Sequence, residues 1–229
     1  MSSGILLDLD DTLYPERSYF ESGVRAVGHW VAARVDDSTA AASIWADVEA
    51  HGRDGFINRI AVPPGHDEAS WRLALVQVYR THEPTLSLFD DVADFIARAR
   101  RSGARLGVIT DGYSRVQWRK AEALGIPALV DAVLCTNDIN APKPAPEGFA
   151  AAATLLGVDP RACTYLADDA SKDFLGPHAL GMSTIQVTRD LPWPLAQPAT
   201  SPQAHAHHRV DSLTAAADLL GLAAGPAMA

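Results

Sequence analysis

Residues 5–13 read ILLDLDDTL, an apolar run that passes directly into a cluster of carboxylates. The apolar residues predict a strand over residues 5–9. Because the carboxyl ends of the strands line the ligand crevice of a parallel sheet, Asp8 and Asp10 are expected to face one small volume there. Paired carboxylates repel one another unless a proton or a cation lies between them. The pair therefore indicates a proton-transferring acid or a metal site, although Asp and Thr in such a turn are also common as helix caps.

The rest of the chain supplies neighbours for that first strand. Short apolar runs that adjoin helix-like stretches recur at residues 105–109, 132–135, 164–166 and 184–187. The clearest helical pattern ends near Gly103 and has its apolar face at Val92, Phe95, Ile96 and Ala99. Strands that alternate with helices predict an α/β fold, in which a parallel sheet is flanked by helices.

A long segment between Pro15 and Leu86 breaks this alternation, because it carries helical patterns and no convincing strand. Its apolar positions form helix faces that need each other for burial. We therefore expect an all-helical domain over residues 15–86, inserted into a core made of residues 1–14 and 87–229. Most aromatic side chains of the insertion are expected to fill its own core.

The end of the chain carries two weaker patterns. Residues 190–203 are rich in proline and predict a loop, and residues 212–220 predict a closing helix. Between them stand three histidines that resemble a metal-binding tract, but histidines in a polar tail are more often solvated. No metal is therefore assigned to His205, His207 and His208.

The composition of the 229 residues excludes several classes of protein. A balance of 19 basic against 28 acidic residues gives a net charge of -9, which disfavours a nucleic acid polymer or an anionic membrane as partner. No apolar stretch approaches the roughly 18 residues of a membrane span, and no secretory leader is recognisable, so a cytoplasmic location is expected. With two cysteines only, Cys135 and Cys163, the count excludes a disulfide scaffold and a four-ligand zinc site.

A second acidic cluster follows the predicted strand at residues 164–166. It consists of Asp168, Asp169 and Asp173, so that five carboxylates converge on one edge of the sheet. Such a concentration of negative charge destabilises an empty site, and Mg²⁺ with oxygen ligands is its natural compensation. Asp173 could equally begin a helix, where acidic residues are favoured.

Polar residues near two further strand ends suit an oxyanion. Thr110 follows the predicted strand at residues 105–109 and precedes Asp111 and Gly112, a turn whose backbone N–H groups could bind oxygen. Lys143 stands between two prolines, so a stiff loop presents its ammonium. Together with a metal these groups make a phosphate site, in which the metal and the lysine supply charge and the threonine and amides supply geometry.

Over the whole chain these features resemble the haloacid dehalogenase superfamily of phosphohydrolases. Its four motifs are matched, in order, by Asp8 to Thr12, by Thr110 with Asp111 and Gly112, by Lys143 with Pro144, and by Asp168 with Asp173. The resemblance implies a Rossmann-like catalytic core, and the helical insertion resembles that family's cap. The sequence departs from the family at Ala167, where a glycine is usual, and Asp169 is a second candidate ligand. The choice between Asp168 and Asp169 as metal ligand therefore stays open.

The resemblance also implies roles for single residues. Asp8 would attack phosphorus to form an aspartyl-phosphate, and Asp10 would protonate the leaving alkoxide and later deprotonate the hydrolytic water. Thr110 and Lys143 would hold the phosphoryl oxygens. Further contacts to the substrate are expected from Thr12, Asp111 and Gly112, whereas Asp11 is expected to be a solvated turn residue. The metal ligands would be Asp8, the backbone carbonyl of Asp10, and Asp168, with Asp169 or Asp173 orienting the bound waters.

The predicted function is that of a Mg²⁺-dependent phosphatase acting on a small phosphorylated metabolite. A phosphotransferase or mutase that keeps the same intermediate is the main alternative, and a non-catalytic phosphoacceptor is the weakest one. The substrate would be a nucleoside monophosphate or a sugar phosphate, and the rings of Tyr14, Tyr19 and Phe20 tilt the choice slightly toward a nucleotide. The sequence leaves a monomer and a small homo-oligomer equally open.

Overall fold

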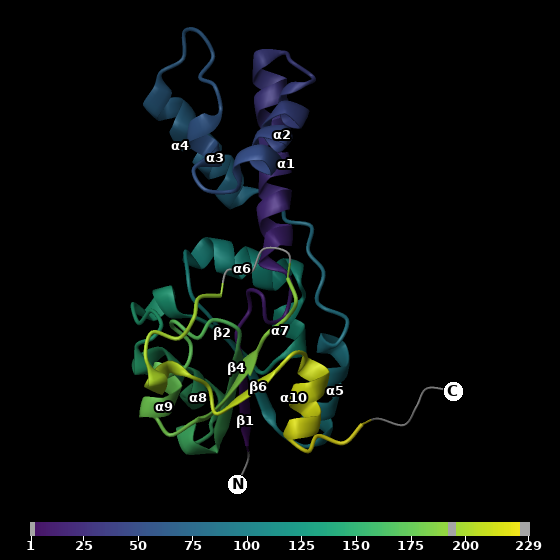
Figure 1. Cartoon of the computed structure of the whole chain (residues 1–229), viewed down its shortest axis with the longest axis vertical. Helices are drawn as coiled ribbons and strands as arrows, with labels where there is room; N and C mark the ends of the chain where they lie inside the picture. Colours follow the sequence, from purple (N-terminus) through teal and green to yellow (C-terminus); the bar gives the residue numbers. More distant parts are fainter. Residues whose placement is uncertain (1–2, 192–195, 225–229) are drawn as a thin grey trace, which may run out of the picture. The chain divides into compact units, whose positions relative to one another are not determined.

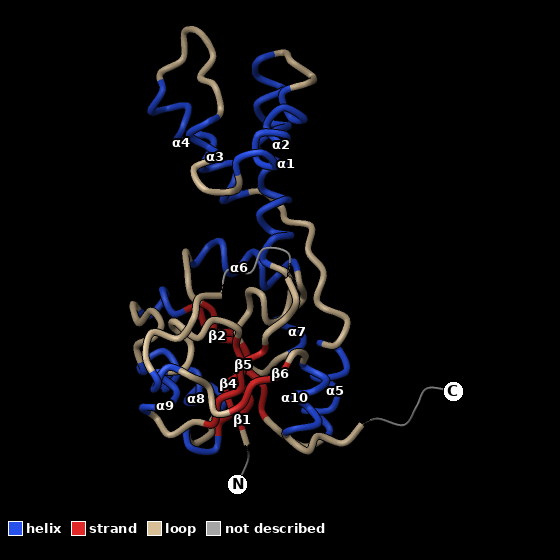
Figure 2. The backbone as a smooth tube through the Cα atoms, viewed as in Figure 1, coloured by secondary structure: helices blue, strands red, loops and turns tan. Residues whose placement is uncertain are grey.

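The computed structural model describes residues 3–191 and 196–224. The chain divides into two compact units, one made of Met1–Glu16 and Leu86–Ala229 and the other of Arg17–Thr85. Figure 1 shows both units along the sequence, and Figure 2 shows that the strands belong to the first of them.

The first unit is built on a six-stranded parallel sheet. Its strands are β1 (Gly4–Leu7), β2 (Arg105–Thr110), β3 (Ala132–Cys135), β4 (Cys163–Ala167), β5 (Ser183–Val187) and β6 (His208–Val210). The order across the sheet is β3-β2-β1-β4-β5-β6, and every neighbouring pair is parallel. The predicted parallel α/β sheet is thus confirmed, with the first strand at its centre. The sixth strand was not predicted, because its three residues, His208, Arg209 and Val210, do not form an apolar run.

Helices cover both faces of this sheet. They are α5 (Val92–Arg101), α6 (Ser114–Ala123), α7 (Ile126–Leu129), α8 (Pro146–Leu156), α9 (Leu175–Ala179) and α10 (Leu213–Leu219). Figure 1 shows α8 and α9 on one side of the sheet and α5 and α10 on the other. The helix α5 buries the four residues of its predicted apolar face, and Gly103, with a φ of 79°, follows its end. Short 3-10 turns occupy Thr136–Ile139, Pro160–Ala162 and Pro202–Ala204.

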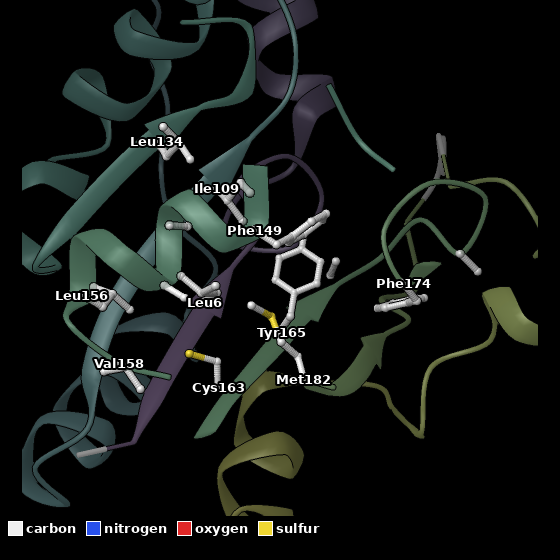
Figure 3. Packing of buried hydrophobic residues seen from close by; sticks show 14 residues of the cluster. Leu6, Ile109, Leu134, Phe149, Leu156, Val158, Cys163, Tyr165, Phe174 and Met182 are labelled. Atoms are coloured by element: carbon white, nitrogen blue, oxygen red, sulfur yellow. The ribbon is translucent and has the colours of Figure 1, made fainter. Parts of the chain in front are cut away.

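The core beneath the site lies between α8 and the sheet (Figure 3). Phe149 of α8 and Tyr165 of β4 are both fully buried and meet edge to face, with ring centroids 5.0 Å apart. Phe174 packs on the other side of Tyr165, at 6.4 Å between centroids. Aromatic pairs in this geometry add to the stabilisation from burial alone. They hold the carboxyl end of β4 in a fixed position under the acidic cluster.

The second unit is helical throughout its regular structure, as predicted for the insertion after the first strand. It contains α2 (Ala40–His51), α3 (Phe56–Arg59), α4 (Glu68–Thr81) and all but the first residue of α1 (Glu16–Val35). Its core includes Phe20 against Phe56 and Phe56 against Tyr79, with ring centroids 5.5 Å and 5.6 Å apart. The rings therefore fill the core of the unit, as the sequence analysis expected. No helix in the described ranges is long and apolar enough to cross a membrane.

The end of the chain differs in part from the sequence-based expectations. The predicted loop at residues 190–203 contains the 3-10 turn, and its residues 192–195 lie outside the described residues. Of the three histidines, His207 is exposed but not free, because its Nδ1 accepts a hydrogen bond of 3.1 Å from the Thr184 N–H. Its ring also lies 4.5 Å from that of His178. The expectation of a merely solvated tract was therefore wrong for His207, which fastens the start of β6 to β5.

Candidate active site

Three neighbouring strands carry acidic or hydroxyl side chains at their carboxyl ends. Asp8 follows β1, Asp168 follows β4, and Thr110 is the last residue of β2. The Asp8 N–H donates to the Leu166 carbonyl at 2.9 Å, which continues the pairing of β1 with β4 past the end of the strand. The register of the central strands therefore brings the motifs together, as the rule for parallel sheets predicts.

A group of three buried carboxylates forms at this edge. Ligand oxygens of Asp8, Asp168 and Asp173 all lie within 4.8 Å of one another. Since Mg²⁺ binds oxygen at about 2.1 Å, its ligand oxygens lie no more than roughly 4.2 Å apart, so a group within 4.8 Å is close to the size that one ion requires. Asp173 is fully buried and precedes α9, so it does not simply cap a solvated helix end.

Lys143 neutralises part of this charge. Its Nζ donates to Asp8 Oδ1 at 2.5 Å, to the Tyr165 hydroxyl at 2.6 Å and to Asp173 Oδ1 at 2.9 Å, and its side chain is 1% exposed. Burial alone would lower the pKa of Lys143, but the Asp173 and Asp8 carboxylates outweigh burial and raise it. The Tyr165 hydroxyl in turn donates to Asp173 Oδ1 at 3.0 Å. Lys143 is therefore a charged ammonium whose three donors are all used.

Two carboxylates of the cluster, Asp8 and Asp168, have raised pKa values. Burial raises the pKa of Asp8 to about 6, with Lys143 opposing the rise and Asp173 adding to it. Burial and the Asp8 and Asp173 carboxylates raise the pKa of Asp168 well above its usual value. The cluster thus holds more negative charge than Lys143 balances. A divalent cation with oxygen ligands would supply the missing positive charge, so these residues fit one.

The two acids after β4, between which the sequence left the choice of metal ligand open, differ in their surroundings. Asp168 points into the carboxylate group, whereas Asp169 Oδ1 accepts from the Ser171 N–H at 3.0 Å, the Ser171 hydroxyl at 2.6 Å and the Gln197 N–H at 3.1 Å. The Asp169 N–H donates to Asp173 Oδ2 at 3.1 Å. Asp169 therefore orders the loop that presents its neighbours, and its carboxylate does not belong to the group of three.

Asp10 lies in a hydrogen-bond network of its own. Its carboxylate accepts from the Tyr14 hydroxyl, from Lys120 Nζ at 2.7 Å and from Gln117 Nε2 at 2.8 Å. Burial would raise the pKa of Asp10, but the charge and hydrogen bond of Lys120, with the Tyr14 and Gln117 hydrogen bonds, lower it. The sequence did not indicate Gln117 and Lys120 as residues of the site, although both are polar residues at positions of α6 that face the core.

The two threonines of the motifs differ in their partners. Thr110 Oγ1 accepts from Gln117 Nε2 at 2.5 Å. The hydroxyl of Thr12 is buried, and within the described residues it has no hydrogen-bond partner. The backbone carbonyl of Thr12 is held by Arg189, whose Nη2 donates at 3.0 Å. The Thr12 hydroxyl is therefore available to a ligand.

The turns after β1 and β2 are also tied to the rest of the site. Asp11 was expected to be solvated, and this was wrong: it is 4% exposed and its Oδ1 accepts from the Glu16 N–H at 2.8 Å. Its φ of 54° folds the side chain back onto the start of α1. Asp111 Oδ1 accepts from the Thr136 hydroxyl and from the Lys143 N–H, so it joins the second motif to the third. Gly112 has a φ of 134°, a conformation that favours glycine.

Comparison with known proteins identifies the family. Residues 3–181 match the family model of the haloacid dehalogenase-like hydrolases, and the chain belongs to this family. The match confirms the resemblance to the haloacid dehalogenase superfamily. The helices that follow the first strand are consistent with the expected cap insertion.

Individual relatives and solved structures are similar to this chain over most of its length. A glyceraldehyde 3-phosphate phosphatase from Methanopyrus kandleri is 29% identical over 200 residues, which cover 82% of this chain and 85% of that protein. A HAD phosphatase from Thermococcus onnurineus has a TM-score of 0.62 at 20% identity and covers 98% of this chain and 100% of that one. The Bacillus subtilis protein YfnB, solved bound to magnesium, has a TM-score of 0.65 at 17% identity, over 96% and 98% of the two chains. At 20% and 17% identity, the last two similarities show a shared fold alone.

Proposed function

We propose that this hydrolase is a Mg²⁺-dependent phosphatase that releases phosphate from a small sugar phosphate through an aspartyl-phosphate on Asp8. One observation carries the proposal: Asp8 lies in a buried group with Asp168 and Asp173, and Lys143 bonds both Asp8 and Asp173. A nucleophilic carboxylate, cation ligands and an ammonium in one small volume suit the attack on a phosphate dianion.

The proposed first step is the attack of Asp8 on phosphorus. Lys143 holds Asp8 Oδ1, so the rotation of the nucleophile is restricted before the substrate arrives. When bound by Asp8, Asp168, Asp173 and the backbone carbonyl of Asp10, Mg²⁺ would offset the negative charge of the carboxylates and the phosphate. The proposal assigns the phosphoryl oxygens to Thr110 and to Lys143, whose Nζ would exchange one of its three contacts with Asp8, Tyr165 and Asp173 for the phosphate. The unpartnered Thr12 hydroxyl, with Asp111 and Gly112 in the turn after β2, is assigned to further substrate contacts.

Asp10 is the proposed acid and base. In the first step it would give its proton to the ester oxygen as that oxygen leaves, and in the second it would take a proton from the water that attacks the aspartyl-phosphate. Lys120 favours the ionised form of Asp10, which suits the second step. The charge of a phosphate dianion beside Asp10 opposes Lys120 and favours the protonated form that the first step needs.

A sugar phosphate is the substrate class that the relatives support. The relative from Methanopyrus kandleri is named a glyceraldehyde 3-phosphate phosphatase, and the match spans most of both chains. The tilt toward a nucleotide depended on aromatic rings that could stack on a base. These rings do not support a nucleotide substrate, because Tyr14, Tyr19 and Phe20 are each at most 2% exposed.

The test is phosphate release from glyceraldehyde 3-phosphate, ribose 5-phosphate and adenosine monophosphate, each with Mg²⁺ or with EDTA. We expect release that requires Mg²⁺, that is fastest with a sugar phosphate and that is lost in Asp8→Asn. Thermal unfolding of Asp8→Asn serves to show that the variant is folded. Undiminished release by Asp8→Asn would overturn the aspartyl-phosphate mechanism, and undiminished release in EDTA would overturn the Mg²⁺ requirement. A preference for adenosine monophosphate would overturn the substrate class.

A further inference from the structure

The helix α6 presents two buried polar side chains to the same carboxylate. Gln117 and Lys120 are three residues apart, so they lie on one face of the helix. Both donate to Asp10: Lys120 Nζ to Oδ1 at 2.7 Å and Gln117 Nε2 to Oδ2 at 2.8 Å. The two oxygens of the carboxylate are therefore held by different donors, which fixes its plane as well as its position.

The burial of these groups is difficult to explain by stability alone. Lys120 is 5% exposed and Gln117 is 3% exposed, on a helix face whose neighbouring position is the buried Ala121. In the pair with Asp10 the Lys120 side chain is 6% exposed and the Asp10 side chain 26%. An ion pair largely shielded from water is often no more stabilising than apolar residues of the same volume, because the charges lose hydration. Apolar residues in place of both Lys120 and Asp10 would therefore serve packing at least as well. The lysine needs another reason to be there.

Gln117 also connects two parts of the site. The same Nε2 that donates to Asp10 donates to Thr110 Oγ1 at 2.5 Å. Its side chain lies over Gly112, where an added Cβ would be 3.4 Å from the Gln117 side chain. The amide thus sets the distance between the carboxylate of Asp10 and the hydroxyl at the end of β2. In the proposed function these are the acid and a ligand of the phosphoryl group.

We propose that Gln117 and Lys120 are positioning residues, which hold the Asp10 carboxylate in the orientation needed for proton transfer to the ester oxygen. The inference rests on the proposed function of Asp10. Misplacement of a reacting group by about 1 Å can cost as much as a hundredfold in rate, so the loss of one of these contacts is expected to be measurable. The effect is expected to depend on whether the leaving group needs a proton.

The leaving group provides the first test. An alkoxide leaves only with a proton, whereas p-nitrophenolate is a weak base that leaves without one. We compare kcat/KM, which covers the steps up to departure of the ester oxygen, for glyceraldehyde 3-phosphate and p-nitrophenyl phosphate. Lys120→Met is expected to lower the value for the sugar phosphate at least about tenfold, and the value for the aryl ester by a clearly smaller factor. An equal loss with both esters, or no loss with either, would overturn the proposal.

A double-mutant cycle provides the second test. If Lys120 and Gln117 act through Asp10, then Lys120→Met and Gln117→Leu lower kcat/KM for the sugar phosphate by less than about twofold once Asp10 is already Asn. A full additional loss in the Asp10→Asn background would show a structural role instead. If Lys120→Met does not fold, Gln117→Leu alone tests the proposal, because the Gln117→Leu variant keeps the ion pair between Lys120 and Asp10. Arg115→Met, at an exposed position of the same helix, is the control.

The two proposals can fail separately. If the wild-type protein releases no phosphate from either ester, the proposed function fails and this inference falls with it. If the wild-type protein is active and Asp10→Asn slows hydrolysis of the sugar phosphate, while the α6 variants behave like Arg115→Met, only the positioning role is wrong.

Discussion

Lys143 Nζ lies 2.5 Å from Asp8 Oδ1, although the two residues are separated by 135 positions in the chain. The contact joins the loop before α8 to the end of the central strand, and it is closed to water on nearly all sides, with side-chain exposures of 1% and 7%. A lysine in that position restricts the carboxylate and offsets the charge of an approaching phosphate. The same ammonium also bonds Asp173 at 2.9 Å, so it is the main counter-charge of the cluster.

Removal of this ammonium is expected to affect both activity and stability. In Lys143→Met, kcat should fall at least about a hundredfold, as for the loss of a donor to a transition-state oxyanion. The free energy of unfolding in EDTA should fall by about 3–5 kcal/mol, because buried carboxylates lose their counter-charge. Arg161→Met, which breaks an exposed ion pair with Asp159, is the control and should leave the free energy of unfolding almost unchanged. Equal urea unfolding curves for the two variants would contradict this.

Stability without metal is expected to fall as the pH rises from about 4 to 7. The pKa of Asp8 is raised from 3.8 to about 6, and that of Asp168 is raised too, so the folded state binds more protons than the unfolded state in this range. Their contribution is complete below pH 4 and is lost as the pH passes the folded pKa. For Asp8 alone the shift corresponds to on the order of 3 kcal/mol.

The measurement is urea unfolding between pH 4 and 7.5, in EDTA and in Mg²⁺. Asp10 has a lowered pKa and contributes in the opposite sense, but only as the pH falls below its usual value near 4. Magnesium should flatten the pH dependence, because it compensates the same carboxylates. The slope in EDTA should also be smaller in Asp8→Asn. A stability in EDTA that rises steadily up to pH 7 would show that the cluster does not carry the excess charge described.

The sequence predicted the parts of the site that depend on strand ends. Asp8 and Asp168 each follow an apolar run, and the geometry of a parallel sheet brings such positions together whatever the loops do. It did not predict the contacts of Asp10, because Gln117 and Lys120 come from a helix more than 100 positions away. A usable signal existed: both polar residues occupy the face of α6 that buries Ala121. Polar residues within an apolar helix face indicate a buried polar partner.

Other features had no local signal at all. Tyr165 reads as an ordinary strand residue, and only the tertiary structure brings its hydroxyl to Lys143 and Asp173. Asp11 looked like a turn residue exposed to water, but its left-handed backbone turns the carboxylate toward the N–H of Glu16. Such contacts depend on where the next element begins, which a pattern of residue types does not give.

The hydroxyl of Tyr165 is expected to stabilise the cluster. It accepts from Lys143 Nζ at 2.6 Å and donates to Asp173 at 3.0 Å, while the ring keeps its packing against Phe149 in a Tyr165→Phe variant. Loss of two buried hydrogen bonds to charged groups should lower the free energy of unfolding by at least about 1.5–3 kcal/mol, which is the contribution of one such bond. The matched control is Thr154→Val, which removes an exposed hydroxyl on α8 and should stay within about 0.5 kcal/mol. Thermal unfolding that does not separate the two variants would contradict the role given to this hydroxyl.

Gly176 of α9 packs closely against the loop that carries Lys143. A Cβ added at Gly176 of α9 would lie 2.5 Å from the Pro144 carbonyl oxygen and 2.7 Å from the Phe149 ring. Since one neighbour is backbone and the other is a packed core ring, neither can yield without moving the loop. Gly176→Ala should therefore lower the free energy of unfolding by about 1–3 kcal/mol. It should also lower kcat, because the displaced backbone adjoins Lys143. Ala179→Ser, at an exposed position of the same helix, should alter neither quantity, and a Gly176→Ala protein with unchanged stability and kcat would show that the loop is free to shift.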